Sequence, residues 1–278
     1  MTVLCATRVQ EIPPRVFSGR ASEHAFFGVS ALLFMASAAL TTVWCESMSG
    51  TREMPMPGHW TMSMTWMRMS GQTWLGAATS FVGMWLVMMI AMMLPSLVPM
   101  LRRYRECLAG GGEARRGRLT TLFGVAYFFV WTVFGIVVFP LGAALTTAEM
   151  RLPGLARAVP VSVGAVVLIC GAVQFTPWKA HHLACWREAM RGRREPSLDP
   201  ATAWRHGHQL GLHCGYCCAN LTAILLVIGV MDLRAMAVVT AAITAERLAP
   251  GGDHVPRAIG AVVIGAGLLL IARSAGLA

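Results

Sequence analysis

Three cysteines and one histidine lie close together in the run His213-Cys214-Gly-Tyr-Cys217-Cys218. Residues three and four apart lie on one face of a helix, so a helical Cys214 would share a face with Cys217 and Cys218. His213 and Cys217 form a second pair of this kind. Thiolate donors select Cu(I), Zn²⁺ or iron–sulfur clusters over hard cations, so the run predicts a soft-metal site. The alternatives are thiol–disulfide redox chemistry, which also uses CxxC pairs, and buried thiols that only pack.

A second group of donors, His181, His182 and Cys185, lies in the segment 174–187. Proline is favoured in the first turn of a helix, and a helix that begins at Pro177 would place His181 and Cys185 on one face. Two imidazoles and a thiol at this spacing fit part of a metal site. The alternative is that these side chains anchor the chain at the lipid–water interface.

Methionine provides an uncharged soft donor in the segment 85–99. Met88 and Met92 are four residues apart, and Met93 lies on an adjoining helix face. Pro95 cannot donate the backbone hydrogen bond of a continuous helix, so we expect the helix to kink or end there. Thioethers bind Cu(I), although methionine also fills irregular gaps in helix bundles.

Seven further methionines and His59 lie between residues 48 and 69. In an oxidising compartment thioethers still bind Cu(I), whereas thiols are oxidised. The segment therefore predicts a second copper-binding region. The alternative is an amphipathic helix that lies on the membrane surface with Met and Trp on its apolar face.

The composition indicates that a membrane-embedded chain positions these donors. Hydrophobic residues make up 56% of the sequence and charged residues only 13%, against about a quarter charged in soluble domains. Backbone groups in lipid must be paired within their own segment, so apolar runs of about 20 residues predict helices. We predict an all-α, polytopic transmembrane helical bundle with about seven spans, or six if the short sixth span does not cross. The expected spans are residues 26–45, 74–94, 120–145, 159–176, 214–231, 234–248 and 257–273.

Lysine and arginine are divided unequally between the two sides of this bundle, with 17 on the side of the N-terminus and 6 on the other. Basic loops stay in the cytoplasm, which predicts a multi-pass membrane protein with a cytoplasmic N-terminus. The predicted organisation is a cytoplasmic tail (1–25), a first span with an external methionine-rich loop (26–73), and a bundle that carries the Cys, His and Met motifs (74–278). These motifs fall at the cytoplasmic end of the bundle, beside the expected loops 95–118 and 177–213.

Among the acidic residues, two lie near the predicted membrane boundary. Asp232 and Glu246 are expected to pair there with neighbouring arginines. Gly260, Gly265 and Gly267 in the last span are suited to close contact with another helix.

Three motifs occur together in the bundle. They are Trp85 followed by Ala91-Met92-Met93-Leu94-Pro95; Gln174, Thr176, Pro177 and Lys179 followed by Cys185 and Arg187; and Cys214, Cys217 and Cys218. Together they resemble a bacterial family of domains of unknown function, described as predicted metal-binding integral membrane proteins. The resemblance covers about residues 74–273 and implies a metal site in a membrane bundle. Many members have two cysteines, three and seven residues beyond the lysine, where this chain has His182 and Trp186.

The donor types favour a membrane protein that handles copper, bound as Cu(I) for transport, storage or delivery by ligand exchange, without catalysis. Zinc is the alternative metal. A structural or assembly subunit of a larger membrane complex, and a thiol–disulfide membrane oxidoreductase, are the alternative functions. The expected partners are the lipid bilayer and a membrane or periplasmic protein, and no nucleic acid. The predicted metal ligands are His181, His182, Cys185, His213, Cys214, Cys217, Cys218, Met88, Met92 and Met93.

Overall fold

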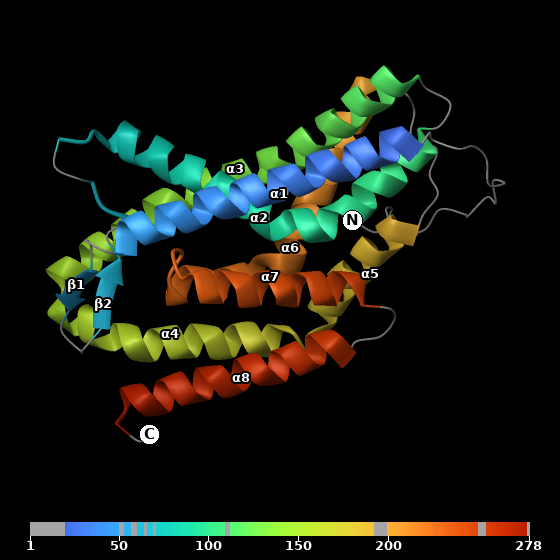
Figure 1. The fold of residues 1–278 in the computed structure, drawn as a ribbon. Coiled ribbons are helices and arrows are strands. Elements are labelled where there is room, and N and C mark those ends of the chain that lie inside the picture. The colour runs from blue at the N-terminus through green and yellow to red at the C-terminus, as the bar shows by residue number, and fades with distance from the viewer. Residues whose placement is uncertain are drawn as a thin grey trace.

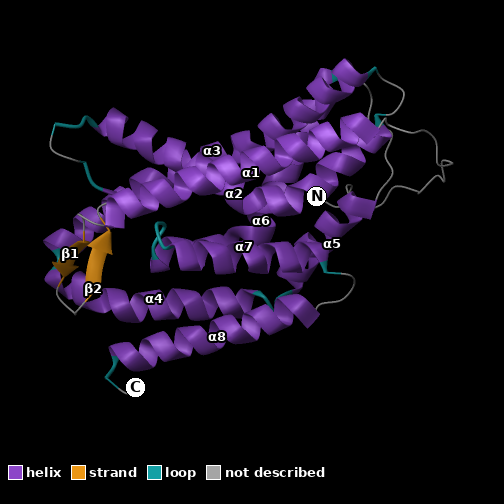
Figure 2. Ribbon diagram, in the orientation of Figure 1, coloured by secondary structure: helices purple, strands orange, loops and turns teal. Residues whose placement is uncertain are grey.

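The computed structural model describes residues 20–49, 53–56, 60–63, 66–68, 71–108, 112–191, 199–249 and 254–276. These residues form a bundle of helices with one short β-hairpin (Figures 1 and 2). The predicted tail lies mostly outside the described residues, but residues 20–25 already belong to the first helix. The elements are α1 (Arg20–Ser49), β1 (Glu53–Met56), β2 (Trp60–Ser63), α2 (Trp74–Cys107), α3 (Glu113–Arg151), α4 (Pro153–Val173), α5 (Pro177–Arg191), α6 (Pro200–Ile228), α7 (Leu233–Leu248) and α8 (His254–Ser274).

The β-hairpin marks one end of the bundle and α5 marks the other, here called the hairpin end and the α5 end (Figure 1). The two strands pair antiparallel, with Met54 opposite Met62 and Met56 opposite Trp60. The chain is therefore extended here, and the alternative of an amphipathic helix is wrong for these strands. His59 lies outside the described residues.

Six helices are long and apolar enough to cross a membrane: α1, α2, α3, α4, α6 and α8. Their outward faces carry large apolar side chains, as a lipid-facing surface requires. Leu32 of α1 is 70% exposed and Val262 of α8 is 74% exposed. The prediction of an all-α transmembrane bundle is confirmed.

The helix α7 corresponds to the short sixth span. Its 16 residues extend for about 24 Å, whereas the hydrocarbon core of a bilayer is about 30 Å thick. Asp232 begins the helix as a cap, and its carboxylate accepts a hydrogen bond from the backbone N of Arg234 at 2.8 Å. The helix packs against α2 and α6 and returns the chain to the α5 end (Figure 1). The structure thus has six helices of spanning length, which is the number given by the alternative of six spans. The shorter α7 brings Glu246 and Arg247 back to the α5 end.

The helix α2 continues through both of its prolines, Pro95 and Pro99, and ends at Cys107. It therefore does not end at Pro95, which was one of the two expected outcomes. Neighbouring helices and hydroxyl side chains support the backbone around a proline in membrane helices. Here α1, α3 and α7 pack against α2, and the Ser96 hydroxyl donates to the carbonyl O of Met93 at 3.1 Å.

Glycines allow α4 and α8 to approach closely. A β-carbon on Gly267 would lie 2.8 Å from the backbone N of Leu168, and one on Gly260 would lie 2.8 Å from Cβ of Gln174. Two of the three glycines expected at a helix contact thus face another helix of the same chain. Gly265 faces open space.

Candidate metal centre

The helix α6 begins well before the cysteine motif. The side chain of Asp199 caps it by accepting a hydrogen bond from the backbone N of Thr202 at 3.0 Å, and Pro200 occupies the first turn. Cys214 therefore lies near the middle of α6, where its side chain is buried. The prediction that the motif opens a span at the membrane face is wrong, because residues 200–213, expected in a loop, are helical. The three thiols lie inside the bundle.

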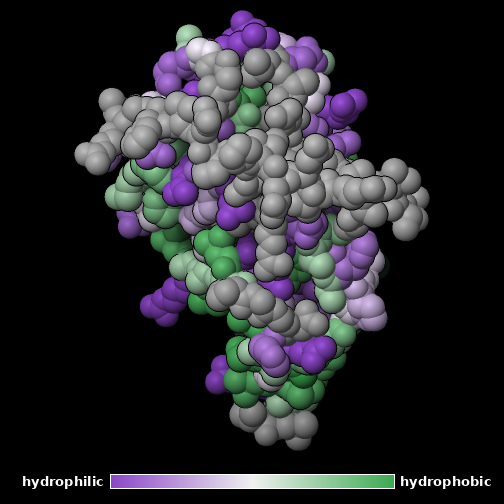
Figure 3. Space-filling model, turned by 90° about the vertical axis from the view of Figure 1, so that its right-hand side faces the viewer, coloured by the Kyte–Doolittle hydropathy of each residue, from purple (hydrophilic) through white to green (hydrophobic). Residues whose placement is uncertain are grey.

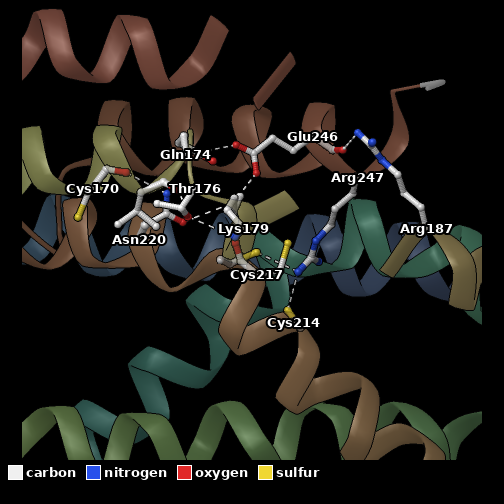
Figure 4. Close-up of polar contacts among 12 residues, drawn as sticks. Cys170, Gln174, Thr176, Lys179, Arg187, Cys214, Cys217, Asn220, Glu246 and Arg247 are labelled. Atoms are coloured by element: carbon white, nitrogen blue, oxygen red, sulfur yellow. Dashed lines mark hydrogen bonds and ion pairs between the residues drawn. The ribbon is translucent and has the colours of Figure 1, made fainter. Parts of the chain in front are cut away.

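Cys214 contacts residues from three other helices. The hydroxyl O of Tyr127 in α3 lies 2.7 Å from the Cys214 sulfur, and Sδ of Met93 in α2 lies 3.9 Å from it. Gly211 allows α3 to approach, because a β-carbon at that position would lie 2.9 Å from the carbonyl O of Tyr127. The third neighbour is Arg247 of α7, whose Nη2 donates to Cys214 Sγ at 2.8 Å (Figure 4).

The same nitrogen of Arg247 also donates to Cys218 Sγ at 2.9 Å. Two cysteine sulfurs therefore converge on one cationic group. Nη1 of Arg247 donates to the Ser96 hydroxyl at 2.8 Å. The guanidinium carbon lies 3.9 Å from the ring centre of Trp186, which is a cation–π distance.

The charge of Arg247 must be balanced within the bundle. Its side chain is 2% exposed, and no carboxylate among the described residues forms an ion pair with it. A buried guanidinium without a counter-charge is strongly unfavourable. The groups in contact with it that can become anionic are the sulfurs of Cys214 and Cys218. A thiolate on one of them balances the charge and provides a soft anionic donor in the interior.

A buried ion pair lies beside the thiols (Figure 4). Lys179 Nζ lies 2.8 Å from Glu246 Oε2, and the two side chains are 0% and 1% exposed. The same ammonium donates to the carbonyl O of Cys217 at 2.6 Å, and Gln174 Nε2 donates to Glu246 Oε1 at 2.6 Å. The expectation that Glu246 pairs with an arginine is wrong for its carboxylate, because its ion-pair partner is Lys179. Arg187 donates instead to the backbone O of Glu246, at 2.9 Å.

The donors of α5 lie at the end of the bundle that faces the viewer in Figure 3, where patches of hydrophilic side chains are visible. His181 is exposed, and His182 and Cys185 are partly buried. The helix begins at Pro177 as predicted, and His181 Nε2 lies 3.7 Å from Cys185 Sγ, so these two side chains do share a face. The ring centre of His182 lies 6.3 Å from that of His213 in α6. The pKa of His182 is lowered, first by burial and then by the nearby His181 and His213. A neutral imidazole is the form that binds metals.

The structure thus separates the predicted ligands into the buried thiols of α6 and a second group, formed by the donors of α5 and His213. The methionines predicted as ligands are all buried in α2: Met88, Met92 and Met93. Of these, Met93 lies against Cys214. We call Cys214, Cys218 and Met93 the inner site. The remaining thiol, that of Cys217, is buried, and Cys217 directly precedes Cys218 in α6.

The inner site has few donors. Among the described residues, no group of three or more His, Cys, Asp or Glu side chains is arranged to hold a metal ion. Structural zinc sites use four such ligands. Two thiols and a thioether instead form a soft donor set of the type that selects Cu(I).

Arg247, Tyr127 and Ser96 were not predicted to contribute to the site. Arg247 follows Glu246 at the end of a short apolar run, a position that indicates only a charge at the membrane boundary. Tyr127 is one of only three tyrosines in the chain, and its hydroxyl lies within an otherwise apolar segment. Polar groups inside membrane spans usually have partners in the bundle, and this rule is the signal by which Tyr127 could have been found.

Comparison with known proteins gives one family. Residues 82–270 match the PpoB2 family model, which is described as a copper chaperone. No curated protein and no solved structure is significantly similar to the chain. The matched segment is more than half of the 278 residues and contains the inner site and the donors of α5. The chain therefore belongs to the PpoB2 family of copper chaperones.

Proposed function

We propose that the chain binds Cu(I) at the inner site and passes the ion on by ligand exchange. Copper is the cargo, and no bond in another substrate is made or broken, so we do not propose an enzyme. The observation that carries the proposal is the convergence of the Cys214 and Cys218 sulfurs on one nitrogen of Arg247, at 2.8 and 2.9 Å. A position where two sulfurs already accommodate a positive charge suits a soft cation, with Met93 as the third donor.

Arg247 balances the charge of the inner site both without copper and with copper bound. Without copper, one thiolate neutralises the guanidinium. With copper, two thiolates and one Cu(I) carry a single negative charge, which the guanidinium neutralises in turn. Because Ser96 and Trp186 also hold Arg247, it keeps two contacts when the sulfurs turn to the metal.

We place this activity in the bacterial inner membrane, with the N-terminus and the α5 end in the cytoplasm. The support is the division of basic residues, 17 on that side against 6 on the other. The family description, a copper chaperone, favours delivery over storage. Delivery requires an acceptor, which we propose to be a membrane or periplasmic protein.

The test is Cu(I) binding by the purified chain in mild detergent under reducing conditions, with the ion supplied from a chromogenic chelator. Loss of groups that only support a metal site lowers metal affinity about 10–100-fold. The double variant Cys214→Ser, Cys218→Ser removes two ligands, so its Cu(I) affinity should fall at least as much. Elemental analysis after gel filtration should show loss of the thiol-bound ion.

The matched control is Cys45→Ser. Cys45 is also buried, and its sulfur lies near a methionine, Met231 Sδ, at 3.7 Å, but it belongs to α1. This variant should bind copper as the unaltered chain does. An unchanged affinity in the double variant, or an equal loss in the control, contradicts the proposal.

A further inference from the structure

Two imidazole nitrogens at the α5 end are buried without a hydrogen-bond partner. They are Nδ1 of His182 in α5 and Nδ1 of His213 in α6, for which the described part of the chain supplies no donor or acceptor. Buried polar atoms are normally paired. Two unpaired nitrogens on neighbouring rings therefore point to a ligand that both can bind.

The spacing of the two rings suits one shared metal ion. Their centres lie 6.3 Å apart, and two imidazoles on opposite sides of an ion, each bound at about 2.0 Å, have centres about 6 Å apart. The ring of His182 also packs against Trp178 and Tyr216, with centres 4.6 and 5.5 Å away. These contacts restrict its position in the absence of an ion.

His213 brings the imidazole pair next to the inner site. It directly precedes Cys214, and it lies four residues before Cys217, so His213 and Cys217 share a face of α6. The buried Cys217 in turn directly precedes Cys218 of the inner site. Donors therefore follow one another from the α5 end to the inner site, through His213, Cys217 and Cys218.

We propose that His182 and His213 form an outer Cu(I) site, which exchanges the ion with the inner site through Cys217. This inference rests on the proposed function, because copper is the same cargo. Imidazole is a harder donor than thiolate, so Cu(I) moves from the outer to the inner site with a gain in affinity. The step involves no redox change. A copper–nitrogen bond is replaced by a copper–sulfur bond, and the thiol proton of Cys217 passes to the released imidazole.

The experiment is a Cu(I) titration of the full chain, with X-ray absorption at the copper edge to identify the ligand atoms. The unaltered chain should bind about two ions, with nitrogen and sulfur ligands. The double variant His182→Ala, His213→Ala should bind one, with sulfur ligands only. It should also load the inner site from the chelator about 10–100-fold more slowly, the range seen when groups that support a metal site are lost.

The matched control is His254→Ala, which removes the exposed histidine that begins α8 at the same end of the bundle (Figure 1). If the double variant does not fold, His213→Asn provides a smaller change that still removes the imidazole. If the histidine variants still bind two ions and load at an unchanged rate, the outer site is disproved, whereas the inner site is not affected by this result. If the variant Cys214→Ser, Cys218→Ser still binds one ion, with nitrogen ligands, that result supports two separate copper sites. An unaltered chain that takes up no Cu(I) overturns the proposed function itself.

Discussion

At the scale of single residues, one arginine sets the electrostatics of the cysteine cluster. A thiol away from positive charge keeps its proton at neutral pH, so a thiolate donor requires a neighbouring cation. Lys179 does not contact the inner sulfurs, because its ammonium bonds Glu246 and the Cys217 carbonyl O. Arg247, 29 residues along the chain from Cys218, supplies the cation. No spacing rule connects these two positions, which is why the sequence predicted the thiols but not their counter-ion.

Replacing Arg247 should change how many protons copper displaces. With the arginine, the two inner cysteines hold one proton between them, and Cu(I) binding releases it. In Arg247→Gln both thiols are protonated below their usual pKa of about 8.5, so binding must release two protons. The Cu(I) affinity should therefore rise about tenfold per pH unit in the unaltered chain and about a hundredfold in the variant.

The measurement is a series of chelator competitions between about pH 6 and pH 8, below the usual thiol pKa. Arg234→Gln is the control, since this exposed arginine begins α7. Identical slopes in Arg247→Gln and the unaltered chain would show that Arg247 does not hold a thiolate.

At the scale of elements, the ion pair of Lys179 and Glu246 joins three helices around the cysteines. It links α5 to α7 directly, and the bond from Lys179 to the Cys217 carbonyl O adds α6. Both side chains are excluded from solvent, so removing either leaves the other charge buried and uncompensated.

The variant Lys179→Met should destabilise the fold by about 3–5 kcal/mol, the cost of breaking a buried pair from one side. Adding Glu246→Gln should recover most of this loss, because no net charge then remains buried and Gln174 keeps an acceptor. Unfolding by denaturing detergent measures both variants. The control is Glu106→Gln, which breaks an exposed pair with Arg102 at 2.9 Å and should have little effect. A double variant as unstable as Lys179→Met would disprove this account.

The helices themselves were largely predictable, and their boundaries less so. The helix at Pro177 was predicted from the preference of proline for a first turn, and His181 and Cys185 meet on it as expected. The same preference applies to Pro200, where Asp199 is also a good cap. The charged and small residues just before it, however, are typical of a flexible connector. The start of α6 was therefore placed too late, and the cysteines were expected at the membrane face.

At the scale of the whole molecule, the path of α7 decides how many times the chain passes through the bundle. By length α7 falls short of a membrane span, yet it runs from the hairpin end to the α5 end, and α8 then runs back (Figure 1). Local thinning of a bilayer accommodates a short helix at modest cost. The start of α1 and the end of α8 consequently lie at opposite ends of the bundle.

This arrangement predicts that reporters at the two ends of the bundle lie on opposite sides of the membrane. Alkaline phosphatase, which is active only outside the cytoplasm, should be active when fused after Ser274 and inactive when fused after Cys107, at the α5 end of α2. A fluorescent protein fused before Arg20 should fluoresce, because the excess of basic residues predicts a cytoplasmic location for that end. In the opposite case α7 does not cross the membrane, and the chain crosses it only six times. Both ends of the chain then lie on one side, and phosphatase fused after Ser274 would be inactive. That result would also move Glu246 and Arg247 away from the α5 end, and the inner site with its counter-ion could not form as described.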